Sequence, residues 1–201
     1  MLEPVDLPGS RSAPLFIDKY LFLFYTLSMA HLMIDIETLG TTPDAHILTI
    51  AAQIFDPLQR DWLGQSYYAR VDFESQENRR IEQGTLEWWS TQKESQTEAF
   101  AEENRIPLDT ALTELGKLIW QSKRIWANGS NFDMTILEDA YKSYGMPLPW
   151  QYFHVRDART VFGLAPNLQT YPASHHALED CRRQIDLLWD TLEYLKIREL
   201  K

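Results

Sequence analysis

The stretch HLMIDIET, residues 31–38, ends an apolar strand in a pair of acidic side chains. Successive side chains of a strand point to opposite faces of a sheet, so Asp35 and Glu37 share one face while Ile34 and Ile36 share the other. Two neighbouring carboxylates repel each other unless a proton or a cation offsets their charge. Because solvated acids are common at strand ends, this pair alone does not identify a site.

Outward from this strand, hydrophobic periodicity predicts an antiparallel meander of three strands, followed by helices that alternate with two further strands. The expected strands cover residues 31–36, 47–55, 67–73, 124–127 and 150–155. The expected helices cover residues 84–92, 95–103, 131–144 and 157–162, with another opened by Pro107 and a long one from about His176. This order predicts an α/β fold of the ribonuclease-H-like type, a mixed sheet flanked by helices.

Two more acids follow along this layout. Asp133 begins a helix just after the fourth strand, in NGSNFD (residues 128–133), where Phe132 is expected to anchor the turn in the core. Asp180 lies early in the last helix, in HHALED (residues 175–180). Each acid has an ordinary explanation, since an acid near a helix N-terminus is favourable by itself. Three motifs in this order, at the end of the first strand, after the fourth strand and early in the last helix, indicate one site.

With these motifs the chain resembles the DEDD superfamily of 3′–5′ exonucleases, the proofreading-subunit-like proteins, and in particular its DEDDh branch. The match covers roughly residues 31–197. The residues that carry it are Asp35, Glu37 and Thr38 in the first motif, Asn128 through Asp133 in the second, and His175 and Asp180 in the third. A narrower resemblance, to the small bacterial and phage branch that includes the phage DexA-type exonucleases, rests on Glu87-Trp88-Trp89 and Arg156-Asp157-Ala158-Arg159-Thr160.

The resemblance implies a site for two divalent cations. Asp35, Glu37 and Asp180 would bind the first ion, Asp35 would bridge to the second, and Asp133 would help to hold it. An oxygen-rich set of this kind suits Mg²⁺ or Mn²⁺. The implied reaction is hydrolysis of single-stranded DNA or RNA from its 3′ end to nucleoside 5′-monophosphates, with a histidine as general base.

Two adjacent histidines compete for the role of general base. His176 lies four positions before Asp180, on the same helical face, which would suit a metal ligand. The family spacing instead selects His175, in the loop before the helix. We therefore predict His175 as the general base and His176 as a first-turn residue of the helix.

The predicted substrate contacts are Thr38, Trp88, Trp89, Asn128, Arg156 and Arg159. Adjacent residues on a helix diverge by about 100°, so one of the two tryptophans can pack inward while the other faces the cleft and stacks on a base. The alternative is that both tryptophans pack in the core.

Six arginines outside the acidic motifs need a separate interpretation. Arg156 and Arg159 either contact phosphate or pair with nearby acids. The dipeptides Arg79-Arg80 and Arg182-Arg183 are expected to be solvated.

The bulk composition restricts the function further. The chain has 201 residues and a net charge of −10. This charge argues against tight, non-specific binding of nucleic acid and predicts that the substrate binds weakly and only with metal present. Its single cysteine, Cys181, fits a reducing compartment and a cytoplasmic protein.

Residues 1–30 form an atypical extension ahead of an exonuclease domain at 31–201. The apolar run YLFLFYTLSMA, residues 20–30, is too short to span a bilayer and lacks the positive segment that precedes a signal peptide's apolar core. The favoured interpretation is that translation starts at Met29 or Met33. The alternatives are a genuine N-terminal segment, packed or disordered, and export or anchoring. No stable membrane association is expected.

Two other functions stay open. One is a non-catalytic relative that only binds nucleic acid or a replication partner, and the four carboxylates with the histidine weigh against it. The other is a ribonuclease-H-type endonuclease, which commonly lacks the His-x-x-x-x-Asp arrangement. The sequence does not decide between the 3′ ends of DNA and of RNA as substrates. The resembling families include dimers, so a homodimer is one of the assemblies expected.

Overall fold

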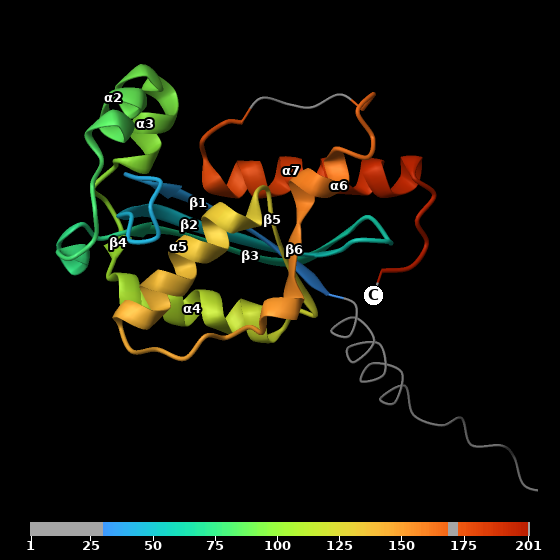
Figure 1. The fold of residues 1–201 in the computed structure, drawn as a ribbon, viewed down its shortest axis with the longest axis horizontal. Helices are drawn as coiled ribbons and strands as arrows, with labels where there is room; N and C mark the ends of the chain where they lie inside the picture. The colour runs from blue at the N-terminus through green and yellow to red at the C-terminus, as the bar shows by residue number, and fades with distance from the viewer. Residues whose placement is uncertain (1–29, 169–172, 201) are drawn as a thin grey trace, which may run out of the picture.

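The computed structural model describes residues 30–168 and 173–200 (Figure 1). The extension predicted at residues 1–30 lies outside these residues except for Ala30. Within the described ranges, no helix is both long enough and apolar enough to cross a membrane.

A six-stranded mixed sheet in the order β4-β3-β2-β1-β5-β6 forms the centre of the molecule (Figure 1). The strands are β1 (His31–Thr38), β2 (Ile47–Asp56), β3 (Asp61–Val71), β4 (Arg105–Ile106), β5 (Arg124–Ala127) and β6 (Val155–Asp157). The first three are antiparallel neighbours, as the predicted meander requires. β5 runs parallel to β1, β6 parallel to β5, and β4 parallel to β3. The predicted mixed sheet is therefore confirmed.

Helices cover both faces of this sheet (Figure 1). They are α2 (Gln83–Thr91), α3 (Lys93–Ala99), α4 (Leu108–Trp120), α5 (Ser130–Ser143), α6 (Ala158–Phe162) and α7 (Ala177–Tyr194), with 3₁₀ turns η1 (Glu74–Gln76) and η2 (Tyr152–His154). One face packs on α4 and α5, and there Ile34 and Ile36 join the core. The other packs on α7, where Met33 joins a second cluster. Because β2 lies between two covered faces, all of its residues are buried.

Three local predictions were wrong. The segment predicted as a strand at 150–155 is mostly the turn η2, and β6 begins only at Val155. Trp150 is buried against Tyr141 instead, with ring centroids 5.4 Å apart. The helix expected at 95–103 ends at Ala99, and β4 was missed, because a strand of two residues carries no periodic signal.

Candidate active site

The structure brings the four predicted carboxylates together at the C-terminal end of β1. Asp35 and Glu37 extend from the strand itself, and Asp180 lies in the first turn of the neighbouring α7. Asp133, in the first turn of α5, approaches from the side: its Oδ1 accepts a hydrogen bond from the main-chain N–H of Ile36, 3.2 Å away.

A divergence between two strands makes room for Asp133. The pairing of β1 with β5 runs from His31 and Arg124 to Met33 and Trp126, so the N–H of Ile36 lies beyond the part of β1 that pairs with β5. A main-chain donor left without a partner is costly when buried. The carboxylate of Asp133 satisfies the N–H of Ile36, and α5 thereby takes the position beside β1 that β5 has left.

Gly129 shapes the turn that delivers Asp133. It precedes α5 with φ at 102°, in the left-handed region that favours glycine. A Cβ atom there would also lie 3.2 Å from Nη2 of Arg159, which donates a hydrogen bond to the carbonyl oxygen of Asn128 at 2.9 Å. Asp157 completes the turn by accepting from the N–H of Ser130 at 2.7 Å.

Asp180 holds the loop that carries His175. Its Oδ1 accepts hydrogen bonds from the N–H and Oγ of Ser174, at 2.8 and 2.9 Å, and its Oδ2 accepts from the N–H of His175 at 2.8 Å. His175 has φ at 56°, a left-handed conformation that is unfavourable for a side chain with a Cβ atom. The hydrogen bonds to Asp180 stabilise this conformation.

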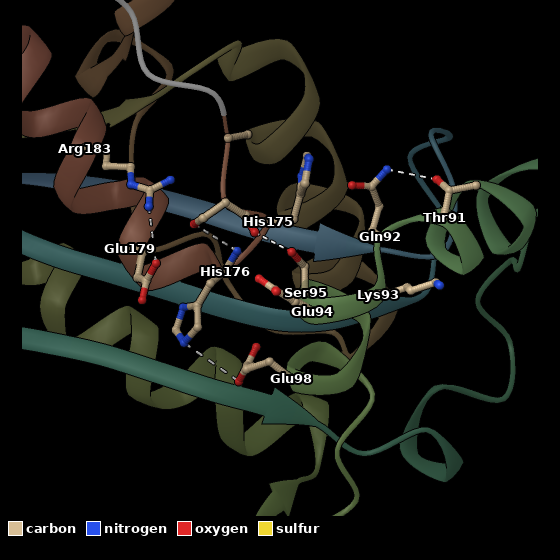
Figure 2. A pocket seen from close by; sticks show the side chains of 12 residues that line it. Thr91, Gln92, Lys93, Glu94, Ser95, Glu98, His175, His176, Glu179 and Arg183 are labelled. Atoms are coloured by element: carbon tan, nitrogen blue, oxygen red, sulfur yellow. Dashed lines mark hydrogen bonds and ion pairs between the residues drawn. The ribbon is translucent and has the colours of Figure 1, made fainter.

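The two histidines face different neighbours (Figure 2). A ligand atom of His175 lies within 4.8 Å of carboxylate oxygens of Glu37 and Asp180. His176, the residue before α7, stacks on the ring of Tyr68 with centroids 4.9 Å apart and lies 3.9 Å from Glu98. The geometry therefore favours His175 over His176 as the histidine that acts with the acids.

The two tryptophans of α2 diverge as the helical spacing predicts. Trp89 is 1% exposed and donates its indole N–H to the carbonyl oxygen of Thr38 at 2.9 Å, so it braces the end of β1. Trp88 is 40% exposed, and its ring meets the ring of His175 edge-on, with centroids 4.8 Å apart. Trp88 thus reaches the site, whereas Trp89 belongs to the core.

A cleft of about 280 Å³ lies beside Glu37. Its lining is formed by Ile36, Glu37, Thr38, Gly40, Thr41, Gly84, Thr85, Trp88 and Phe132. The prediction that Phe132 anchors the core is wrong, since this side chain is 37% exposed and lines the cleft. Phe132 shares a helical face with the buried Ile136, but it lies one turn earlier in α5. At that level of the helix the neighbouring end of β1 borders the cleft, so the side chain of Phe132 is not covered.

Arg156 and Arg159 have separate surroundings. The positive charge of Arg159 lowers the pKa of Asp133, against the larger effect of burial, so this guanidinium lies near the acids. Arg156 donates to the carbonyl oxygens of Phe153 and Val155, and its charge acts on His31 at the opposite end of β1. The structure does not bring Arg156 to the site.

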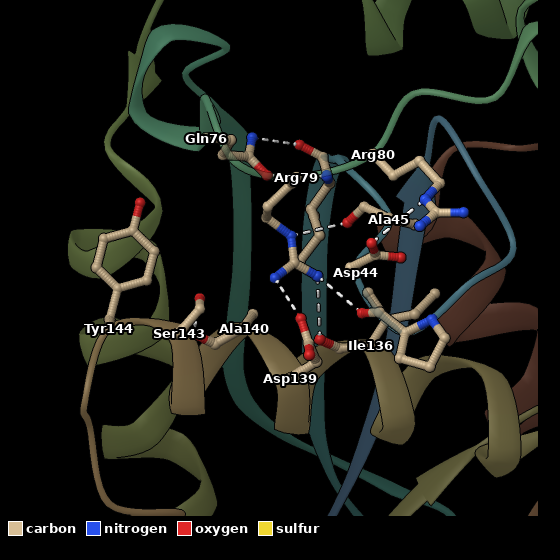
Figure 3. A network of polar contacts seen from close by, with 12 residues as sticks. Asp44, Ala45, Gln76, Arg79, Arg80, Ile136, Asp139, Ala140, Ser143 and Tyr144 are labelled. Carbon is tan, nitrogen blue, oxygen red and sulfur yellow. Dashed lines mark hydrogen bonds and ion pairs between the residues drawn. The ribbon is translucent and has the colours of Figure 1, made fainter.

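Arg79 was expected to be solvated and is instead buried (Figure 3). Its guanidinium donates hydrogen bonds to the carbonyl oxygens of Ala45 and Pro43, at 2.8 and 3.0 Å, and pairs with Asp139 of α5 at 2.9 Å. It therefore ties the segment that follows β1 to the helix that carries Asp133. Arg80 has an exposed side chain, as expected. The sequence contains no signal that would tell which of the two adjacent arginines is buried.

Three of the site acids, Asp35, Glu37 and Asp133, have raised pKa values. For Asp35, burial is the largest cause, followed by the charges of Asp133 and Glu37. Burial and the charge of Asp180 raise the pKa of Glu37 to about 8. Burial raises that of Asp133 to about 7, although the N–H of Ile36 opposes the shift. Cations at this position would remove the repulsion and stabilise the ionised carboxylates.

Gln184 also lies at the site, although it is not one of the residues predicted from the motifs. Its Nε2 donates to Oδ1 of Asp35 at 2.8 Å, while its Oε1 is buried with no hydrogen-bond partner among the described residues. The available signal was the spacing, because Gln184 follows Asp180 by four residues on one helical face. An all-carboxylate donor set and an unsatisfied acceptor beside it fit a hydrated Mg²⁺ or Mn²⁺.

Comparison with known proteins agrees with this geometry. Residues 30–191 match the family described as the 3′-5′ exoribonuclease Rv2179c-like domain. The exodeoxyribonuclease of enterobacteria phage T4 is 23% identical over 211 residues, which cover 83% of this chain and 90% of the relative.

Solved structures share the fold at low identity. The zinc-bound complex of E. coli exonuclease I with single-stranded DNA has a TM-score of 0.65 at 15% identity; the match covers 84% of this chain and 41% of that chain, so this chain spans only about two fifths of that protein. The nuclease domain of 3′hExo, a DEDDh family member bound to rAMP, has a TM-score of 0.58 at 11% identity; the match covers 86% of this chain and 95% of that chain. The Mg²⁺- and Mn²⁺-bound form of S. pombe Pop2p has a TM-score of 0.60 at 11% identity, and the match covers 92% of each chain.

The family match spans most of the chain, including all three acidic motifs and His175. The predicted resemblance to DEDDh exonucleases is therefore confirmed. The chain belongs to the family of 3′-5′ exoribonuclease Rv2179c-like domains and is a 3′–5′ exonuclease of the DEDDh type.

Proposed function

We propose that this exonuclease removes nucleotides one at a time from single-stranded nucleic acid with the help of two divalent cations, and releases nucleoside 5′-monophosphates. The observation that carries the proposal is the convergence of four carboxylates on one end of β1. Burial raises the pKa of Asp35, Glu37 and Asp133 there, and the charges of neighbouring site acids also raise the pKa of Asp35 and of Glu37. Such a set is unfavourable without positive charge and suited to holding cations.

Each acid has a distinct place in the proposed site. Asp35, Glu37 and Asp180 would hold one cation, and Asp35 with Asp133 would hold the other. When bound, the cations supply an activated water and stabilise the charge that develops on the scissile phosphate. Pop2p, which shares the fold, has been observed with Mg²⁺ and Mn²⁺, and we infer the same choice of ions here.

His175 is the proposed general base. It lies beside Glu37 and Asp180, where it would take the proton from the attacking water, and imidazole suits this role near neutral pH. The hydrogen bonds from Ser174 and His175 to Asp180 fix the loop, so one carboxylate orients both the base and a cation. The rings of Trp88 and His175 pack edge to face, with their centroids 4.8 Å apart.

The cleft beside Glu37 is the proposed place of the 3′-terminal nucleotide. Trp88 and Phe132 offer exposed aromatic surface to a base, and stacking of this kind tolerates every base. Thr38 lines the same cleft, and Arg159, which holds the carbonyl of Asn128, is the proposed phosphate contact. Trp89 and Arg156, whose side chains are engaged elsewhere, are not included.

We infer that RNA is the preferred substrate, because the matching family is described by exoribonuclease activity and 3′hExo was observed with rAMP. DNA is the second candidate, favoured by the phage T4 relative, an exodeoxyribonuclease. The buried, free Cys181 suits the reducing interior of a cell, where both substrates occur. A homodimer remains part of the proposal, and light scattering of the purified protein measures it.

Matched RNA and DNA oligonucleotides with 5′ labels test the activity, in Mg²⁺ or Mn²⁺ and in chelator. We expect progressive shortening from the 3′ end with release of mononucleotides, faster on RNA, and none in chelator. Asp35→Asn should lower the rate by several orders of magnitude, since it removes a charge shared by both cations. Asp186→Asn, the same change on the exposed side of α7, is the control.

The outcomes separate the parts of the proposal. Equal rates for Asp35→Asn and the unaltered protein would overturn the catalytic assignment. Internal fragments in place of mononucleotides would indicate an endonuclease. Faster loss of DNA than of RNA would overturn only the substrate preference.

A further inference from the structure

Gln184 lies where α7 passes the end of β1. It follows Asp180 by four residues, so both side chains extend from the same face of the helix toward the strand. Its Nε2 donates a hydrogen bond to Oδ1 of Asp35 at 2.8 Å. Asp35 is the acid placed in contact with both proposed cations, so Gln184 acts on the central carboxylate of the site.

The other end of the same amide is unsatisfied. Oε1 of Gln184 is buried and has no hydrogen-bond partner among the described residues. A buried polar atom in this condition is unfavourable, and native structures rarely keep one without a reason. Besides Asp180, the neighbours of Gln184 along α7 include Cys181, Ile185 and Leu188, which are apolar and buried, so an apolar side chain would also pack there.

The orientation of the amide follows from the chemistry of its partner. A cation at Asp35 keeps its carboxylate ionised, and an ionised carboxylate accepts hydrogen bonds and donates none, so the NH₂ group of Gln184 faces Asp35 in the cation-bound site. The carbonyl oxygen is then turned away from Asp35 and needs a donor. A water molecule in the coordination shell of a cation held by Asp35 is such a donor, and Mg²⁺ in proteins usually keeps several waters.

We propose that Gln184 is a positioning residue of the cation site, which orients the carboxylate of Asp35 and accepts a hydrogen bond from a cation-bound water. The inference rests on the proposed function, since it requires divalent cations at the four acids. Residues that orient metal ligands in this way commonly change metal affinity or activity by about 10–100-fold when they are replaced.

Thermal unfolding, first in chelator and then across a titration with MnCl₂ alone, tests this role without substrate. In Gln184→Met, which keeps the length of the side chain and removes both polar ends, we expect a metal-free Tm that is unchanged or higher, because the unsatisfied oxygen is gone. The MnCl₂ concentration that gives half of the full rise in Tm should increase about 10–100-fold. Gln121→Met is the matched control, because Gln121 follows α4 on the opposite face of the sheet.

A second variant covers the case in which Gln184→Met fails to fold. Gln184→Glu keeps the shape and an acceptor oxygen but places a further negative charge beside Asp35. It should lower the metal-free Tm and enlarge the rise in Tm that saturating MnCl₂ produces, since the cations offset the added charge.

Contrary results have distinct meanings. If the unaltered protein shows no rise in Tm with MnCl₂, the cation site of the proposed function fails, and this inference fails with it. If it responds and both Gln184 variants respond at the same MnCl₂ concentrations and to the same extent, Gln184 has only a packing role and the inference is overturned, while the proposed function stands.

Discussion

At the scale of single residues, the His175–His176 pair shows how one backbone conformation assigns two similar side chains to different tasks. The left-handed conformation of His175 directs its ring toward Glu37 and Trp88, and the next residue returns to an extended conformation and stacks on Tyr68. Asp180 maintains this arrangement through its hydrogen bonds to the loop. The division of roles is therefore a property of the backbone as much as of the imidazole rings.

The residue scale gives a direct comparison of the two histidines. His175→Ala should lower kcat by about 10²–10⁴-fold, the usual contribution of a positioned general base, with little change in the Tm of the protein. His176→Ala removes a ring stacked on Tyr68, outside the group of Glu37, His175 and Asp180, and should change kcat by less than about tenfold. Steady-state kinetics on one RNA substrate measures both, and an equal loss in the two variants would contradict the assignment of His175.

At the scale of elements, the site depends on how the segment after β1 is connected to α5. Arg79 bonds to two carbonyl groups of that segment and to Asp139 of α5. The same segment forms one wall of the cleft through Gly40 and Thr41, and α5 forms another through Phe132. A buried arginine thus connects the two parts of the chain that form these walls.

Replacing this arginine tests the connection. Arg79→Met should lower the free energy of unfolding by about 2–4 kcal/mol, because buried carbonyl groups lose their donors. Arg80→Met should cost less than about 0.5 kcal/mol, since the Arg80–Asp44 pair is exposed. Urea unfolding measures both values, and similar midpoints for the two variants would show that burial of Arg79 has no energetic consequence.

At the scale of the whole molecule, the acidic site links stability to pH. Asp35, Glu37 and Asp133 have pKa values raised above those of an unfolded chain, which lie near 4 for such groups. Without cations, the folded state therefore binds more protons than the unfolded state between about pH 4 and pH 8. Their contribution to stability is fully present below about pH 4 and is lost as the pH rises through this window.

This linkage predicts how metal and pH act together. The rise in Tm caused by MgCl₂ should be larger at pH 8 than at pH 5.5, because protons compete with the cation for the carboxylates at the lower pH. At about 100 times the dissociation constant, the stabilisation of about 2.7 kcal/mol corresponds to a rise of about 5–10 °C. Calorimetry with and without chelator at each pH measures the rise in Tm, and the difference removes the contribution of titrating groups elsewhere, such as His31. An equal rise in Tm at both pH values would contradict the prediction.

The sequence by itself determined the features that depend on local pattern. Alternation along β1 placed Asp35 and Glu37 on one face, and helical spacing separated Trp88 from Trp89. The succession of apolar segments predicted the mixed sheet and its flanking helices. These predictions succeed because strand and helix periods act over a few residues, which are contiguous in the chain.

Only the tertiary structure decided which of two locally equivalent residues is buried or engaged. It buried Arg79 and left Arg80 exposed, opened the cleft at Phe132, and placed the amide of Gln184 against Asp35. It also began β6 at Val155 instead of Trp150. In each case the contact that decides the outcome comes from an element distant in the chain. The free energy of that contact depends on how the helices pack on the sheet, and a local sequence pattern holds no information about this packing.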